Sequence, residues 1–252
     1  MASERPGLTI SGVTVRFGGV TAIDDVCLAV PPATVTGLVG PDGAGKTTLL
    51  DVAAGRRRPS RGTVLLDGVP AESGVARTFQ EPPAPRGRTV REHVLSATRA
   101  RMARRPGCGR TPADRWRWRR DARRGAEETA DALLDRVGIA EHAHAPTRTL
   151  PPGPAQLLQL AKALAAEPRA LLLDQPSAGL SVAESRALEV LLRELAAEGL
   201  AVLLAEHDLE AVIGVCDVLY ALSSGKVIAS GPPVEVRGHP RVRTETRASP
   251  VE

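Results

Sequence analysis

One stretch of the chain decides the fold: Gly40-Pro41-Asp42-Gly43-Ala44-Gly45-Lys46-Thr47, which fits the pattern G-x-x-x-x-G-K-[ST]. The compact apolar run before it, Val35 to Val39, predicts a buried strand, and the helical spacing after it predicts a helix. Such a turn lets backbone N–H groups surround phosphate oxygens at a helix N-terminus. The stretch therefore predicts a phosphate-binding loop, with Lys46 reaching the β- and γ-phosphates and the Thr47 hydroxyl binding Mg²⁺.

A second apolar strand ends in a carboxylate. Residues 170–173 read Ala-Leu-Leu-Leu and are followed by Asp174. By itself, an aspartate at a strand end is usually a turn former or a helix cap. Together with the glycine-rich loop it predicts the other half of a magnesium site, shared with Thr47.

The remaining pattern predicts an α/β domain interrupted by a helical insert. We expect a core over residues 1–86 and 155–236, a helical subdomain over 87–154, and a disordered polar tail over 237–252. Two local signals are specific. Ser181 and Glu184 form a capping box before an apolar helical run that ends at Gly199, and residues 223–225 predict the turn of a hairpin.

Composition excludes several classes of protein. The chain has 252 residues, 42% apolar and 25% charged, which is typical of a globular domain. No apolar run approaches the ~20 residues that cross a bilayer, and the first residues lack the pattern of a signal peptide. The three cysteines have no metal-like spacing. We therefore expect a cytosolic protein with reduced thiols.

The positive charge is concentrated in one segment. Residues 99–124 hold eleven arginines and two aspartates, a local balance of +9, so the rest of the chain is negative although the total is +4. A uniformly basic nucleic-acid-binding surface is not what this distribution predicts. Within the segment, Arg115 to Arg120 reads Arg-Trp-Arg-Trp-Arg-Arg. The run is open to three interpretations: a solvated helical insert, contact with anionic membrane headgroups, or nucleic-acid binding.

Four motifs occur in the order found in ABC-type ATPases, and the chain resembles that family over residues 8–240. The motifs are Gly40 to Thr48, Gln80 after Ala76-Arg77-Thr78-Phe79, Asp174-Gln175-Pro176, and Glu206-His207-Asp208. Arg16-Phe17-Gly18-Gly19 and Ala178-Gly179-Leu180 make it most similar to ATP-binding subunits of branched-chain amino-acid importers, and urea importers are similar as well. The resemblance implies the P-loop fold of ABC ATPases, with an antiparallel β subdomain and a helical subdomain.

The resemblance also implies roles for single residues. Phe17 would stack on adenine, although an aromatic on a first strand can also belong to the core. Gln80 would contact Mg²⁺ and the attacking water and couple the site to a membrane partner. His207 would hydrogen-bond the γ-phosphate. Thr48 would bind the nucleotide as the last residue of the phosphate-binding loop. Gly153 would belong to the glycine-rich signature that a partner subunit offers to ATP.

At two positions the chain departs from the family's pattern. Gln175 stands where the family has the glutamate that polarises the attacking water, and an amide can orient water but cannot accept its proton. In the signature segment, Pro154 has no N–H to offer a phosphate. We therefore expect nucleotide binding with slow turnover.

The function predicted from these features is that of the ATP-binding subunit of an ABC importer. It would bind ATP and Mg²⁺, pair with a second ATP-binding subunit (a copy or a paralogue), and drive a separate membrane permease at the inner face of the membrane. The family places the arginine segment toward the membrane, which favours headgroup contact over nucleic acid. Two alternatives are a hydrolysis-deficient nucleotide-binding regulatory module and an ABC-type protein acting on nucleic acid, which usually carries two cassettes.

Overall fold

The computed structural model describes residues 7–78, 87–103 and 112–248, which fall into two compact units. The first unit contains residues 1–77, 168–177 and 185–252, and the second contains 78–167 and 178–184. The elements of the first unit include strands β1 (Leu8–Phe17), β2 (Val20–Val30), β3 (Thr34–Val39), β4 (Arg61–Leu66), β5 (Val69–Pro70), β6 (Val75–Arg77), β7 (Ala170–Asp174), β8 (Ala201–Glu206), β9 (Val218–Ser223) and β10 (Lys226–Gly231). Its helices are α1 (Lys46–Ala53), most of α5 (Val182–Ala197), α6 (Glu210–Ile213), α7 (Pro233–Gly238) and α8 (Pro240–Ala248).

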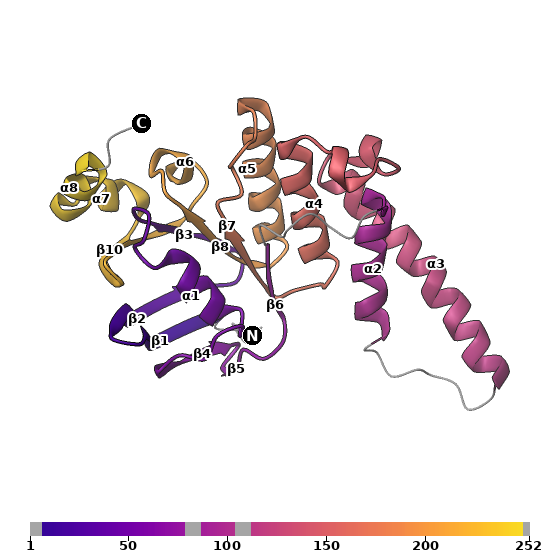
Figure 1. Cartoon of the computed structure of the whole chain (residues 1–252), viewed down its shortest axis with the longest axis horizontal. Coiled ribbons are helices and arrows are strands. Elements are labelled where there is room, and N and C mark those ends of the chain that lie inside the picture. The colour runs from indigo at the N-terminus through magenta and orange to yellow at the C-terminus, as the bar shows by residue number, and fades with distance from the viewer. Residues whose placement is uncertain (1–6, 79–86, 104–111, 249–252) are drawn as a thin grey trace. The chain divides into compact units, whose positions relative to one another are not determined.

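Two sheets form the first unit (Figure 1). One is antiparallel, in the order β2-β1-β4-β5; the other has the order β10-β9-β3-β8-β7-β6. In the second sheet all neighbours are parallel except β9 and β10, which form the hairpin that the sequence predicted. Helix α1 lies between the sheets, and one apolar cluster joins β1, β2, α1, β3, β7 and β8. Because a sheet packs against each side of α1, the helix and the loop that leads into it are held in a fixed position.

The carboxyl ends of three central strands meet at one edge of the parallel sheet. Val39 at the end of β3 pairs with Glu206 at the end of β8, and Asp174 at the end of β7 pairs with Ala205. The segments that follow these strands are the glycine-rich loop, Gln175 and His207. In sheets of this kind, ligands bind at the carboxyl edge. The strand order thus brings together candidate residues from distant parts of the sequence.

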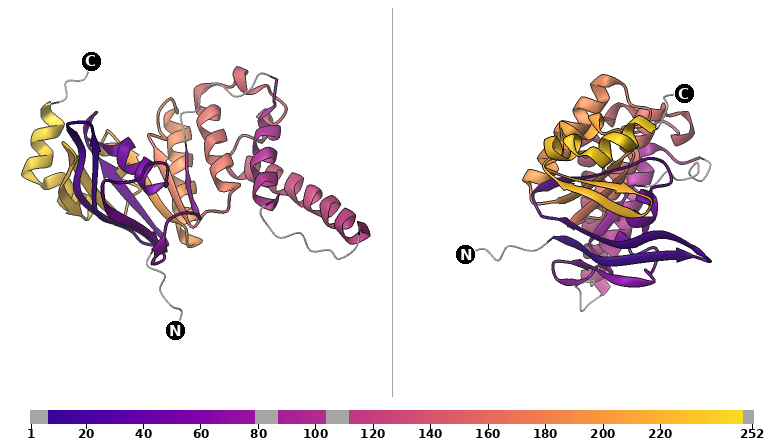
Figure 2. Two further views of the ribbon diagram at one scale, coloured as in Figure 1. Left: turned by 60° about the horizontal axis from the view of Figure 1, so that its bottom comes forward. Right: turned by 90° about the vertical axis from the view of Figure 1, so that its left-hand side faces the viewer.

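The second unit is helical. It contains α2 (Val90–Ala103), α3 (Pro112–Arg136), the short helices η1 (Ala140–His142) and η2 (Thr147–Thr149), and α4 (Pro152–Leu164). Helices α2 and α3 lie side by side (Figure 2). A forked pair of hydrogen bonds from Arg91 to Asp131, at 2.6 and 2.8 Å, links them and lowers the pKa of the Asp131 carboxyl.

The domain limits differ from those that the sequence predicted. The units change at 77/78 and 167/168 rather than near 87 and 154, so α4 belongs to the helical unit. Within the segment 237–252, which was expected to be a disordered tail, residues 240–248 form helix α8, and residues 249–252 lie outside the described residues. Pro240 suits the first position of a helix, and the buried Val242 anchors it.

The predicted capping box of α5 is confirmed. The Ser181 N–H donates to the Glu184 carboxylate at 2.7 Å, and the Glu184 N–H donates to the Ser181 hydroxyl at 3.3 Å. These bonds lower the pKa of Glu184. Reciprocal caps of this kind satisfy two N–H groups that a helix start otherwise leaves to water.

Candidate nucleotide-binding site

The glycine-rich loop connects β3 to α1 in a backbone shape that only glycine permits at key positions. Gly45 precedes α1 with a left-handed φ of 107°, and a Cβ there would lie 2.6 Å from Ile23 Cδ1. At Gly40 a Cβ would lie 2.1 Å from the carbonyl oxygen of Leu222. A Cβ at Gly40 would collide with backbone, and at Gly45 it would be strained by the positive φ and by the backbone oxygen of Ala22 at 2.8 Å. The loop is therefore built for a close approach of its backbone to neighbouring groups.

Lys46 is buried at the start of α1. Its side-chain Nζ donates to the carbonyl oxygens of Gly40 at 2.6 Å and of Pro41 at 3.0 Å, so the ammonium lies across the loop. Burial lowers the pKa of Lys46, and the negative charges of Asp42, Asp174 and Glu206 partly offset that effect. Among the described residues the hydrogen-bond acceptors of this ammonium are neutral carbonyl oxygens, which it can exchange for an anion.

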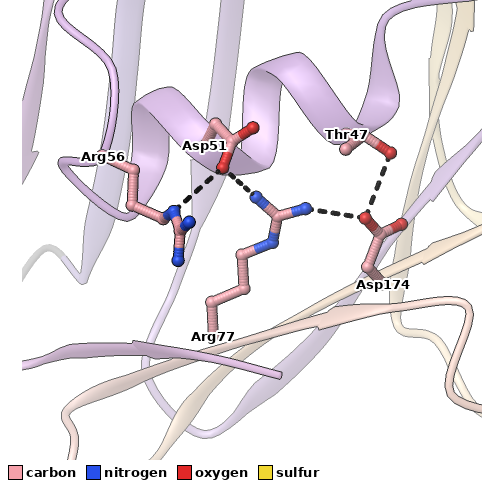
Figure 3. A network of polar contacts seen from close by, with 5 residues as sticks. All are labelled: Thr47, Asp51, Arg56, Arg77 and Asp174. Atoms are coloured by element: carbon pink, nitrogen blue, oxygen red, sulfur yellow. Dashed lines mark hydrogen bonds and ion pairs between the residues drawn. The ribbon is translucent and has the colours of Figure 1, made fainter. Parts of the chain in front are cut away.

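Thr47 and Asp174 meet as the sequence predicted. The Thr47 hydroxyl donates to Asp174 Oδ2 at 3.1 Å, from the first turn of α1 to the end of β7 (Figure 3). A hydroxyl and a carboxylate are oxygen donors of the kind that Mg²⁺ takes, and Mg²⁺ usually keeps waters and phosphate oxygens as its other ligands. The pair fits half of a magnesium site.

Gln175 follows Asp174 in a strained backbone conformation. Its φ of 47° is unusual for a residue with a Cβ, and its N–H donates to the carbonyl oxygen of Ala205 at 2.9 Å. Residue 175 is thereby tied to β8, the strand that leads into His207.

A buried carboxylate lies beneath His207. Glu206 is 2% exposed, and its Oε1 accepts the N–H of Ser177 at 3.2 Å and the Ser177 hydroxyl at 2.6 Å. Its Oε2 has no hydrogen bond among the described residues and lies 3.8 Å from His207 Nδ1. Glu206 therefore connects the segment after Asp174 to the histidine.

Other predicted residues lie in different surroundings. Phe17 is 43% exposed, with the Arg57 guanidinium 4.2 Å above its ring centroid. Gly153 belongs to the helical unit, in the first turn of α4 between Pro152 and Pro154. Gln80 lies outside the described residues, as do the side chains of Arg115 to Arg120, whose backbone falls within α3.

Sequence reasoning missed Arg77, Asp51 and Ser177. Arg77 donates to both Asp51 and Asp174 (Figure 3). One signal was available: Asp51 follows Thr47 by four residues, so the two side chains share a face of the predicted helix. No pattern in the sequence predicted that Arg77 contacts the helix face formed by Thr47 and Asp51.

The fold and the site together define a P-loop nucleotide-binding protein. The sequence profile of the ABC transporter family matches residues 23–178, and the chain belongs to that family. None of the described helices is long and apolar enough to cross a membrane.

Two relatives match over nearly their whole length. The high-affinity branched-chain amino acid transport ATP-binding protein LivG of Escherichia coli (strain K12) is 35% identical, covering 95% of this chain and 96% of that protein. The protein BraF of Pseudomonas aeruginosa, with the same descriptive name, has the same identity and coverage. A crystal structure of a nucleotide-free ATP-binding cassette from an ABC transporter is similar with a TM-score of 0.79 and 26% identity, covering 96% of this chain and 99% of that one. The predicted family and fold class are confirmed.

Proposed function

We propose that this chain is the ATP-binding subunit of an ABC importer and that it powers a separate membrane permease for branched-chain amino acids or similar small polar solutes. The observation that carries the proposal is the hydrogen bond of Thr47 to Asp174 beside the buried Lys46, directly after the glycine-rich loop. The names of the full-length relatives LivG and BraF support the choice of importer and solute. They do not favour a regulatory module, a urea importer or a nucleic-acid ABC protein.

In this proposal the loop holds the phosphates of ATP. Lys46 exchanges the carbonyl oxygens of Gly40 and Pro41 for β- and γ-phosphate oxygens, and the backbone N–H groups of residues 42–48 surround the β-phosphate. Thr47 and Asp174, which already lie within hydrogen-bond distance, would hold Mg²⁺. The bound metal neutralises charge on the phosphates.

The residues around the loop complete the proposed site. His207 hydrogen-bonds the γ-phosphate, with Glu206 beneath it. Gln80 orients the water and couples the site to the permease. Phe17 stacks on adenine with one ring face, since Arg57 covers the other.

The proposed turnover is slow, for two reasons. Gln175 cannot accept a proton from water, and general-base help is typically worth 10²–10⁴-fold. In the first turn of α4, Pro152 and Pro154 have no N–H, so Gly153 alone among these three residues offers one to a phosphate on a partner subunit. A second ATP-binding subunit with an intact signature and its own catalytic glutamate would leave one defect in each site instead of two.

The proposed location is the inner face of the cell membrane, beside the permease. In the arginine segment, Arg115 to Arg120 would contact anionic headgroups, where Trp and Arg both suit the interface.

Nucleotide binding tests the proposal directly. Titration with a fluorescent ATP analogue and Mg²⁺ should give saturable binding that Lys46→Ala weakens by at least about tenfold, because a charge-assisted contact to phosphate is lost. The matched control is Lys226→Ala, which removes an exposed lysine paired with Asp24 at 3.1 Å in the same unit. Equal affinities for wild type and Lys46→Ala would refute the assigned site.

A further inference from the structure

A buried arginine links Asp174 to the helix that carries Thr47. Arg77 donates from one guanidinium nitrogen to Asp51 at 2.5 Å and from the other to Asp174 Oδ2 at 2.7 Å (Figure 3). Its side chain is 5% exposed, whereas those of Asp51 and Asp174 are 31% and 17% exposed. These three residues are called the Arg77 bridge below. Asp174 Oδ2 accepts from Thr47 as well, so the oxygen that Arg77 holds is the oxygen that Thr47 contacts.

The fold explains why the bridge reaches both sides of the site. Thr47 and Asp51 are four residues apart on α1 and therefore lie on one helix face. Arg77 ends β6, which pairs with β7 in parallel, and Asp174 ends β7. The two terminal nitrogens of the planar guanidinium hold the two carboxylates in a fixed relative geometry, which the rotatable N–H groups of a lysine ammonium would define less well.

The charges of the Arg77 bridge favour a role in orienting Asp174 over a role in stabilising the fold. A buried arginine between two carboxylates is compensated, but a buried ion pair is weak evidence for stability. What the bridge does provide is orientation. The planar guanidinium of Arg77 holds Asp174 Oδ2 on one side and, through Asp51, the helix face of Thr47 on the other. In other metal sites, the loss of a residue that hydrogen-bonds a ligating carboxylate changes metal affinity by about 10- to 100-fold.

We propose, on the basis of the nucleotide site proposed above, that Arg77 is a positioning residue that holds Asp174 against Thr47 and so arranges the magnesium site before the metal binds. Two other roles are distinct from this one. Arg77 could serve folding only, with no effect on metal affinity. Alternatively, its positive charge could compete with the metal for Asp174, in which case its removal would strengthen metal binding.

The measurement is the Mg²⁺ concentration that gives half of the maximal gain in affinity for a fluorescent ATP analogue, with an excess of EDTA as the metal-free baseline. Arg77→Met keeps the aliphatic stem and removes the fork, and it should raise this midpoint by about tenfold. Asp51→Asn should raise it less, because Arg77 keeps its bond to Asp174. The double variant should equal Arg77→Met alone, since both residues act through one bridge. Mn²⁺ binding measured by electron paramagnetic resonance should follow the same order.

The matched control is Arg169→Met. Arg169 pairs with Asp67 at 2.6 Å in the same unit, so its removal should lower the melting temperature without moving the Mg²⁺ midpoint. A midpoint that Arg77→Met and Asp51→Asn leave unchanged would reduce the bridge to a structural ion pair. A lowered midpoint would make Arg77 a competitor of the metal. Either result overturns the proposal, whereas rescue by Arg77→Lys, which keeps a donor for Asp174, supports a positioning role.

If Arg77→Met does not fold, the result for Asp51→Asn alone decides the proposal. This variant should fold, because Asp51 is partly exposed and the amide of asparagine has the same shape as the carboxylate it replaces. If wild type gains no affinity from Mg²⁺, the proposed function fails. If wild type does gain and the variants match it, only the role of Arg77 fails.

Discussion

Gln175→Glu should raise the rate of ATP hydrolysis by at least about tenfold. The backbone at position 175 is held with a φ of 47° by the N–H bond to Ala205, and glutamate has the same length as glutamine, so the substitution changes one amide nitrogen into a basic oxygen. A well-placed general base contributes 10²–10⁴-fold, or about 2.7–5.4 kcal/mol of barrier. We expect less than this, because the new carboxylate adjoins Asp174 and Pro154 still weakens the signature. Tenfold corresponds to about 1.4 kcal/mol.

The assay for this prediction is phosphate release at saturating ATP and Mg²⁺, with Lys46→Ala as the blank. The wild-type chain alone should be near that blank, and Gln175→Glu well above it. Addition of a paralogous subunit with an intact signature should enlarge the difference, since Pro154 then affects only one site of the pair. Robust wild-type turnover that Gln175→Glu leaves unchanged would show that another group accepts the proton, and the assignment of residue 175 would be wrong.

Two more predictions concern charge. Burial lowers the pKa of Lys46, so ATP affinity should be full below that lowered pKa and should fall as the pH rises through it. The fall should begin at a lower pH than the ordinary lysine pKa of 10.5 predicts. An affinity that stays constant up to pH 10.5 would contradict this prediction. Replacement of Arg115, Arg117, Arg119 and Arg120 by Gln should weaken binding to anionic vesicles at low salt, by about 1 kcal/mol for each arginine near the surface, with little change in melting temperature. Wild-type protein that does not bind such vesicles would favour a solvated insert.

The sequence predicted those parts of the site whose signal is local. The spacing from Gly40 to Thr47 indicated both the loop and the helix after it, and the apolar run before Asp174 placed that carboxylate at a strand end. Ser181 and Glu184 predicted their own reciprocal bonds, which the structure contains. In each case the residues that interact, or the pattern that reveals them, lie within a few positions of one another.

What the sequence did not predict depends on pairing between distant strands. Arg77 is an ordinary polar residue in a short strand until Asp51 and Asp174, which are 26 and 97 positions away, surround it. The bond from Ser177 to Glu206 needs β7 and β8 to be neighbours. Local propensity cannot specify such neighbours, because they follow from the order of strands in the sheet.

The position of β3 in its sheet has a consequence for how the protein is made. The glycine-rich loop follows β3 early in the chain, yet both neighbours of β3 come from the last quarter, β8 from residue 201 and β9 from residue 218. A ribosome therefore releases the loop long before the strands that fix its shape exist. Incomplete chains that stop before β8 contain the whole loop but lack both strands that flank β3, so the sheet that supports the loop cannot form in them.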